Sequence, residues 1–161
     1  ARAICQTMVP HRYDLVIASA GGHPKDINLY QAQKALTHAS LLTVDGGMAI
    51  LVAACPEGSG SKGYEQFMEG ITRHEDVFDK FQQQGFSVGP HKAIQIARDA
   101  TRIGIVIVSD MSADLVRRLC LHPAASLDEA ITYALTRLPP LPRIAILPKA
   151  TTTIPVTVSL D

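Results

Sequence analysis

The sequence predicts an α/β domain, built on a mostly parallel sheet of about four or five strands with helices on both faces. Short, nearly continuous apolar segments alternate with longer segments in which apolar residues recur every three to four positions. Strands that are apolar on both sides are typical of parallel sheets buried between two layers of helices. We therefore expect residues 1–161 to form a single three-layer, Rossmann-like domain. A chain of 161 residues is long enough to bury a core.

The composition is that of a globular protein without a dominant charge. Apolar residues make up 47% of the chain and charged residues 19%, and 15 basic side chains balance 15 acidic ones. Such a surface has no basic field for nucleic acid or a membrane, and no apolar run approaches the ~18 residues of a membrane helix. Residues 1–4 carry neither an initiator methionine nor a signal-peptide pattern, so we expect a piece of a longer, cytoplasmic protein.

The cysteines and histidines favour neither disulfides nor a metal site. Cys5, Cys55 and Cys120 are odd in number and lack C-x-x-C spacing, which favours a reducing compartment. The six histidines are scattered and form no HxxxH or HxH pair, so we expect no metal site in this chain. Cys55 has no base at a fixed spacing, which favours a buried structural thiol over a nucleophile.

The first half of the chain contains two clear strand–helix units. An apolar run predicts a strand over residues 13–19, and a periodic stripe predicts a helix over residues 27–39, with Asp26 or Asn28 as its cap. A turn at residues 45–47 should lead into a buried strand over residues 48–54. Further helices are expected over residues 64–70 and 75–84, followed by a break at residues 85–89.

The second half repeats the alternation. Pro90 suits the first position of a helix, and residues 102–109 form a third expected strand. Ser112 can cap a helix over residues 113–121, and Ser126 with Glu129 has capping-box spacing. A fourth strand is expected over residues 143–147. Three weaker segments complete the chain: a linker or strand within residues 1–12, an irregular stretch at residues 151–155, and an apolar end at residues 156–158.

The segment after the first strand contains the strongest candidate site. Gly21 and Gly22 permit a sharp turn, after which the expected helix begins. Tyr30 and Lys34 are four residues apart and share one side of this helix, with Gln31 beside them. A phenol, an amide and an ammonium near a helix N-terminus can bind an anionic, oxygen-rich ligand. The alternative interpretation is an ordinary solvated helix surface with a capping amide.

Two further segments leave the same choice open. The glycine-rich loop over residues 55–63 can turn its backbone amides toward an anion, with Glu57 as a polar contact, or can simply connect a strand to a helix. His91 and Lys92 lie in the first turn of a helix, where cations are disfavoured. That position indicates either a nearby anion or side chains that point into solvent.

Residues 21–34 resemble the C-terminal domain of the lactate racemase (LarA) family, and the resemblance continues through residues 45–47, 55–58 and 89–93. It covers most of the chain but only about the last third of that family's length. The family's Tyr-Gln-x-x-Lys motif, whose side chains contact the substrate and cofactor region, matches Tyr30, Gln31 and Lys34.

The resemblance implies inversion of the hydroxyl-bearing carbon of a 2-hydroxy acid. In this family a nickel pincer nucleotide accepts a hydride from that carbon and returns it to the opposite face, and histidines of the N-terminal domain move the proton. The metal ligands and the cofactor-bearing lysine also belong to the N-terminal domain, for which this chain has no matching segment. By itself the chain is therefore expected to be inactive and to bind no cofactor.

The same resemblance assigns expected roles within this chain. Lys34 and Gln31 are the candidate catalytic residues, and Tyr30 joins them in substrate binding. A further set is expected to face the cofactor: Gly21, Gly22, Lys25, Glu57 and His91. The expected partners are the protein's own N-terminal domain and a small 2-hydroxy acid, with no nucleic acid and no membrane.

Two other functions fit the sequence pattern. The glycine loops and balanced charge also suit a non-catalytic Rossmann-like module that binds a nucleotide or a sugar acid. A purely structural domain that moves against a partner is the third hypothesis. It predicts that the surface carrying Tyr30 and Lys34 packs dry against other helices.

Overall fold

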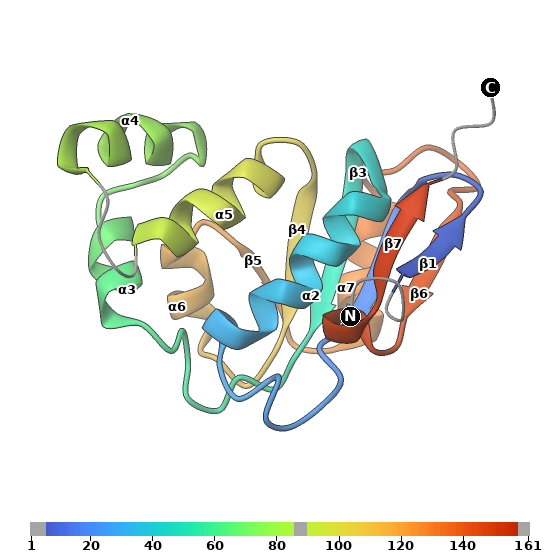
Figure 1. Cartoon of the computed structure of the whole chain (residues 1–161), viewed down its shortest axis with the longest axis horizontal. Helices are drawn as coiled ribbons and strands as arrows, with labels where there is room; N and C mark the ends of the chain where they lie inside the picture. Colours follow the sequence, from blue (N-terminus) through green and yellow to red (C-terminus); the bar gives the residue numbers. More distant parts are fainter. Residues whose placement is uncertain (1–5, 86–89, 158–161) are drawn as a thin grey trace.

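The computed structural model describes residues 6–85 and 90–157, and its centre is a five-stranded, fully parallel sheet (Figure 1). The strand order is β5 (His122–Ala124), β4 (Gly104–Val108), β3 (Thr43–Val52), β2 (Tyr13–Ser19) and β6 (Ile144–Leu147). The apolar run of β2 explains its central place, because Leu15, Val16 and Ala18 are fully buried. The expected α/β class and parallel sheet are confirmed.

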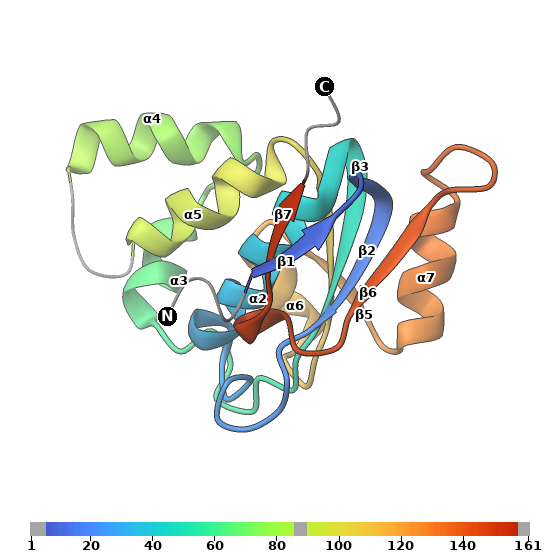
Figure 2. The same ribbon diagram turned by 45° about the vertical axis from the view of Figure 1, so that its right-hand side comes forward.

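Helices cover both faces of this sheet, as Figure 2 shows. One face carries α2 (Leu29–Leu42), α3 (Lys62–Met68), α5 (Pro90–Ala100) and α6 (Ala113–Arg118), and α4 (Glu75–Gln84) packs against α5. The opposite face carries α7 (Leu127–Leu135). The chain thus advances from β2 to β5 on one face and returns to β6 across the other. Within the described ranges, no helix is long and apolar enough to cross a membrane.

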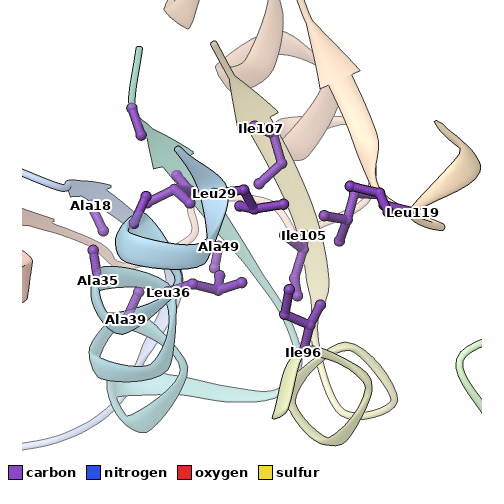
Figure 3. Packing of buried hydrophobic residues seen from close by; sticks show 14 of the residues in the cluster. Ala18, Leu29, Ala35, Leu36, Ala39, Ala49, Ile96, Ile105, Ile107 and Leu119 are labelled. Atoms are coloured by element: carbon purple, nitrogen blue, oxygen red, sulfur yellow. The ribbon is translucent and has the colours of Figure 1, made fainter. Parts of the chain in front are cut away.

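The larger of two apolar clusters lies between the sheet and α2 and α5 (Figure 3). Figure 3 shows Leu36 of α2 and Ile96 of α5 close to Ile105 of β4, while Ala35 lies on the side of α2 toward Ala18 of β2. The stripe expected on α2 is confirmed, because its four apolar positions are all buried: Leu29, Ala32, Leu36 and Ala39. This packing fixes the positions of α2 and α5 relative to the sheet and to each other.

A small second sheet joins the two ends of the described chain. Strand β1 (Gln6–Val9) pairs in parallel with β7 (Ile154–Thr157), which follows the short 3-10 helix η1 (Ala150–Thr152). The sequence left residues 1–12 open between a linker and a strand and described residues 151–155 as irregular. The irregular assignment is wrong for Ile154 and Pro155, because pairing with β1 makes them a strand.

The expected turn at residues 45–47 is also wrong, because β3 continues through it as a bulge. Between the pairs Tyr13–Thr43 and Leu15–Met48, a single residue of β2 lies opposite four residues of β3. Gly47 is required there, since a Cβ atom would lie 2.8 Å from the Asp14 carbonyl oxygen. The turn signals therefore produce a kinked strand.

Most other boundaries agree within a few residues. Residues 13–19 and 75–84 are exact, whereas α2 begins and ends later than the expected 27–39 and α6 ends at Arg118 instead of continuing to residue 121. The missed strand β5 follows α6 and has only three residues, too few for a periodic signal. Gly85 ends α4, while residues 86–89 of the expected break, Cys5 and residue 158 lie outside the described residues.

Candidate functional site

The start of α2 is fixed by Asn28. Its Oδ1 accepts a hydrogen bond from the Gln31 amide at 3.0 Å, and its Nδ2 donates to Glu57 Oε2 at 3.3 Å. Asn28, and not Asp26, is therefore the N-cap. This cap places Tyr30, Gln31 and Lys34 in the first two turns of the helix.

Backbone hydrogen bonds join two loops at the carboxyl edge of the sheet, the loop before α2 and the glycine-rich loop after β3. The Cys55 amide donates to the Asp26 carbonyl at 2.7 Å, and the Glu57 amide donates to the Ile27 carbonyl at 3.0 Å. The first amides of α2 donate back, Leu29 to Gly58 and Tyr30 to Ser59, each at 3.0 Å. The glycine-rich loop thus braces the N-terminus of α2.

The amides of Cys55 and Glu57 donate to carbonyls of the neighbouring loop, so these two amides do not face an anion. The wider hypothesis that backbone amides of residues 55–63 face an anion stays a prediction. The amides of Leu29, Tyr30 and Gln31 are likewise taken by protein acceptors. An anionic ligand at the start of α2 would therefore be held by side chains. Glu57 is exposed and accepts from Asn28.

Four of the predicted site residues lie together where α2 meets α5. Lys34 Nζ lies 3.4 Å from Gln31 Oε1, and the Tyr30 hydroxyl lies 3.4 Å from His91 Nε2. The Tyr30 and His91 rings meet edge to face, with centroids 5.9 Å apart. Lys34 is exposed and the other three are half-buried, so this surface is not packed dry against other helices.

Lys92, which the sequence left open between a nearby anion and a side chain in solvent, joins this cluster. Its ammonium lies 3.1 Å from Gln33 Oε1 and 4.3 Å from the centroid of the Tyr30 ring. The residue is only 8% exposed. Burial, together with the nearby Lys34 ammonium, lowers the pKa of Lys92. A cation in the first turn of a helix was the sequence signal that pointed to it.

A cavity of about 380 Å³ lies between the two helices, and we call it the α2–α5 hollow. Its lining residues are Gln33, Lys34, Thr37, His38, Lys92, Gln95 and Arg98. The lining contains two lysines and an arginine but no carboxylate. Lys34 therefore borders a concave surface, whereas Tyr30 and Gln31 are not among its lining residues.

Gly21, Gly22 and Lys25 lie apart from this cluster. Both glycines have positive φ, +93° and +79°, as their turn requires, and Gly21 lies beside Lys149 and Thr151. The Thr151 hydroxyl donates to the Ala20 carbonyl at 2.9 Å, so η1 covers this end of β2. In the described part of the chain, no hydrogen bond joins these three residues to Tyr30, Gln31 or Lys34.

The thiol of Cys55 is buried beneath the two loops. Desolvation and the carboxylates of Asp26 and Asp110 raise its pKa to about 12, so it is protonated at neutral pH. Its geometry agrees with the interpretation as a structural thiol. Over residues 6–85 and 90–157, no three His, Cys, Asp or Glu side chains are grouped so that they could hold a metal ion.

Comparison with known proteins identifies the family. The sequence model of a protein family, the lactate racemase C-terminal domain, matches residues 8–155. The lactate racemase of Thermoanaerobacterium thermosaccharolyticum is 30% identical over 125 residues, 75% of this chain and 29% of that protein. The lactate racemase of Lactiplantibacillus plantarum is 28% identical over 143 residues, 84% of this chain and 33% of that protein. The chain thus spans about a third of the length of these relatives.

Solved structures agree with the fold. The lactate racemase apoprotein from T. thermosaccharolyticum superimposes with a TM-score of 0.89 at 27% identity, covering 95% of this chain and 37% of that one. A protein from Thermotoga maritima shares the fold at a TM-score of 0.61 and 9% identity, covering 95% of this chain and 39% of that one.

Proposed function

Because the chain belongs to the lactate racemase C-terminal domain family, we propose that it forms one wall of the active-site cleft of a 2-hydroxy-acid racemase. The observation that carries this proposal is the cluster of Tyr30, Gln31, Lys34 and His91 at the N-terminal ends of α2 and α5. All four side chains are polar and solvent-accessible, and they share one surface. An N-terminal domain of the same protein would supply the opposite wall.

Each residue of the cluster has a role that its chemistry suits. The exposed ammonium of Lys34 balances the charge of the substrate carboxylate or of the alkoxide that develops at the hydroxyl. The Gln31 amide, held beside Lys34, hydrogen-bonds a substrate oxygen and fixes its orientation. The Tyr30 hydroxyl, positioned by its contact with His91, hydrogen-bonds a second substrate oxygen.

The nickel pincer nucleotide, when bound, supplies the acceptor for the hydride that leaves the hydroxyl-bearing carbon. The described residues of this chain offer no set of metal ligands, so they suit the wall that faces the cofactor and not the one that holds it. His91 is the residue of this cluster expected to lie against the cofactor. Cofactor contacts outside the cluster are proposed for Gly21, Gly22, Lys25 and Glu57.

A lysine substitution tests the proposal. In the full-length protein carrying its cofactor, Lys34→Ala should lower the rate of racemisation of the preferred 2-hydroxy acid at least ~tenfold, since one lost charged contact costs about 2–4 kcal/mol of transition-state stabilisation. Lys62→Ala is the matched control, because Lys62 is exposed at the start of α3. Unchanged kinetics in Lys34→Ala would remove Lys34 from the site.

A further inference from the structure

Ser59, in the glycine-rich loop, is a buried serine whose hydroxyl both donates and accepts. The residue is only 1% exposed. Its hydroxyl donates to Glu65 Oε1 at 2.5 Å and accepts from the Ser61 amide at 3.1 Å. A hydroxyl has one proton, so the short contact with the carboxylate takes it, ahead of the Ser61 carbonyl at 3.2 Å. The side chain of Ser59 is therefore held in one orientation by its neighbours.

Glu65 connects Ser59 to helix α3. None of the five ion pairs in the described part of the chain includes Glu65, which is half-buried. The helix that carries it is anchored by three side chains buried in the larger apolar cluster: Tyr64, Phe67 and Met68. A carboxylate in the first turn of a helix also stabilises that helix electrostatically. Glu65 can therefore serve as the acceptor for Ser59 or as a support for α3 alone, and its variants have to separate these two roles.

The backbone of Ser59 contacts the start of the candidate site. The first amides of a helix have no acceptor within that helix, and the Ser59 carbonyl supplies one for the Tyr30 amide at 3.0 Å. The Tyr30 hydroxyl in turn lies 3.4 Å from His91 of α5. A continuous series of bonds and hydrogen bonds therefore runs from Glu65 on α3, through Ser59, to Tyr30 on α2. Because α3 also packs against α5, this series places Tyr30 relative to His91.

We propose that Ser59 and Glu65 are positioning residues, which hold the loop carbonyl that fixes Tyr30 in the wall of the active site. This inference rests on the proposed racemase function, in which the Tyr30 hydroxyl binds a substrate oxygen. Neither residue belongs to the cluster of site side chains, so both act through Tyr30. Without the carboxylate, the loop loses its tie to α3 and the phenol loses its fixed place. The rate then falls, because orientation of the substrate is part of catalysis.

Racemisation of lactate by the full-length protein with its cofactor tests the proposal. Glu65→Ala should lower kcat/KM about tenfold, whereas Glu65→Gln, which keeps an oxygen acceptor for Ser59, should stay within about threefold of the unchanged protein. Glu69→Ala is the matched control, because Glu69 is exposed at the end of α3. Combined with Tyr30→Phe, Glu65→Ala should cost less than about threefold, since the hydroxyl that it positions is already gone.

The double variant separates positioning from a purely structural role. A glutamate that only stabilises the fold would lower kcat/KM by the same factor with and without the Tyr30 hydroxyl. A glutamate that acts only on the dipole of α3 would be replaced as poorly by glutamine as by alanine. Either result would overturn the proposal, and so would unchanged kinetics in Glu65→Ala.

Hydrogen exchange separates failure of the positioning role from failure of the racemase function. In Glu65→Ala and Ser59→Ala, a peptide covering residues 28–34 should exchange about fivefold faster or more, while residues 36–42 keep their rate. That result supports the link from α3 to Tyr30 even if lactate is not racemised, in which case lactate racemisation alone is overturned. Racemisation with unchanged exchange in both variants overturns the positioning role alone. Glu65 is half-buried, so its variant keeps the test valid if Ser59→Ala fails to fold.

Discussion

Gly60→Ala adds a single methyl group outside the candidate site, and this group should disturb the start of α2, which positions the site. A Cβ atom at Gly60 would lie 2.6 Å from both Asn28 Oδ1 and Asn28 Nδ2. The Asn28 side chain caps α2, so it would have to rotate and would lose its hydrogen bond from the Gln31 amide. Gly60 also has φ of +72°, a conformation that is strained for alanine.

The magnitude follows from these two terms. Alanine in the left-handed region costs about 1–2 kcal/mol. Loss of an asparagine N-cap costs about 1 kcal/mol. Gly60→Ala should therefore lower the free energy of unfolding by about 2–3 kcal/mol. Gly70→Ala is the matched control, since Gly70 has φ of +77° and a Cβ atom there meets no heavy atom within 4 Å. It should cost only the first term.

Urea denaturation of four variants tests this reasoning. Gly60→Ala should be about 1 kcal/mol more costly than Gly70→Ala. Combined with Asn28→Ala, the Gly60 substitution should cost about 1 kcal/mol less than the sum of the two single changes, because the cap is already lost. Equal costs at Gly60 and Gly70, together with additivity at Asn28, would refute the link between the loop and the start of α2.

Two further predictions concern other parts of the molecule. Arg102 donates to the Thr43 carbonyl, Asp45 and Ser40 at 2.7–2.8 Å, so Arg102→Ala should lower the free energy of unfolding by about 2–3 kcal/mol, measured by urea denaturation. Cys55 should resist maleimide at pH 7 until the protein unfolds, because its pKa is about 12; mass spectrometry of the labelled peptide checks this.

Features with a local cause could be predicted from the sequence. The apolar run of β2 and the side-chain caps at Ser112 and Ser126 act within a few residues, and each appears where its pattern indicated. The same holds for Tyr30 and Lys34, whose spacing of four places them on one side of a helix whatever its surroundings.

Features that depend on distant segments could not be predicted from the sequence. Pairing of β1 with β7 joins the two ends of the described chain, and the bulge in β3 depends on the Asp14 carbonyl of the neighbouring strand. The α2–α5 hollow depends on how two helices pack, and Arg98 borders it only through that packing. No spacing within the sequence carries that information.

The central claim is that the surface of Tyr30, Gln31 and Lys34 faces the substrate. The most direct measurement is a crystal structure of the full-length protein with its cofactor and a bound 2-hydroxy acid. We expect Lys34 Nζ within about 3.2 Å of a substrate oxygen, with Gln31 or Tyr30 as a second contact. A ligand bound elsewhere, with Lys34 pointing into solvent, would contradict the claim.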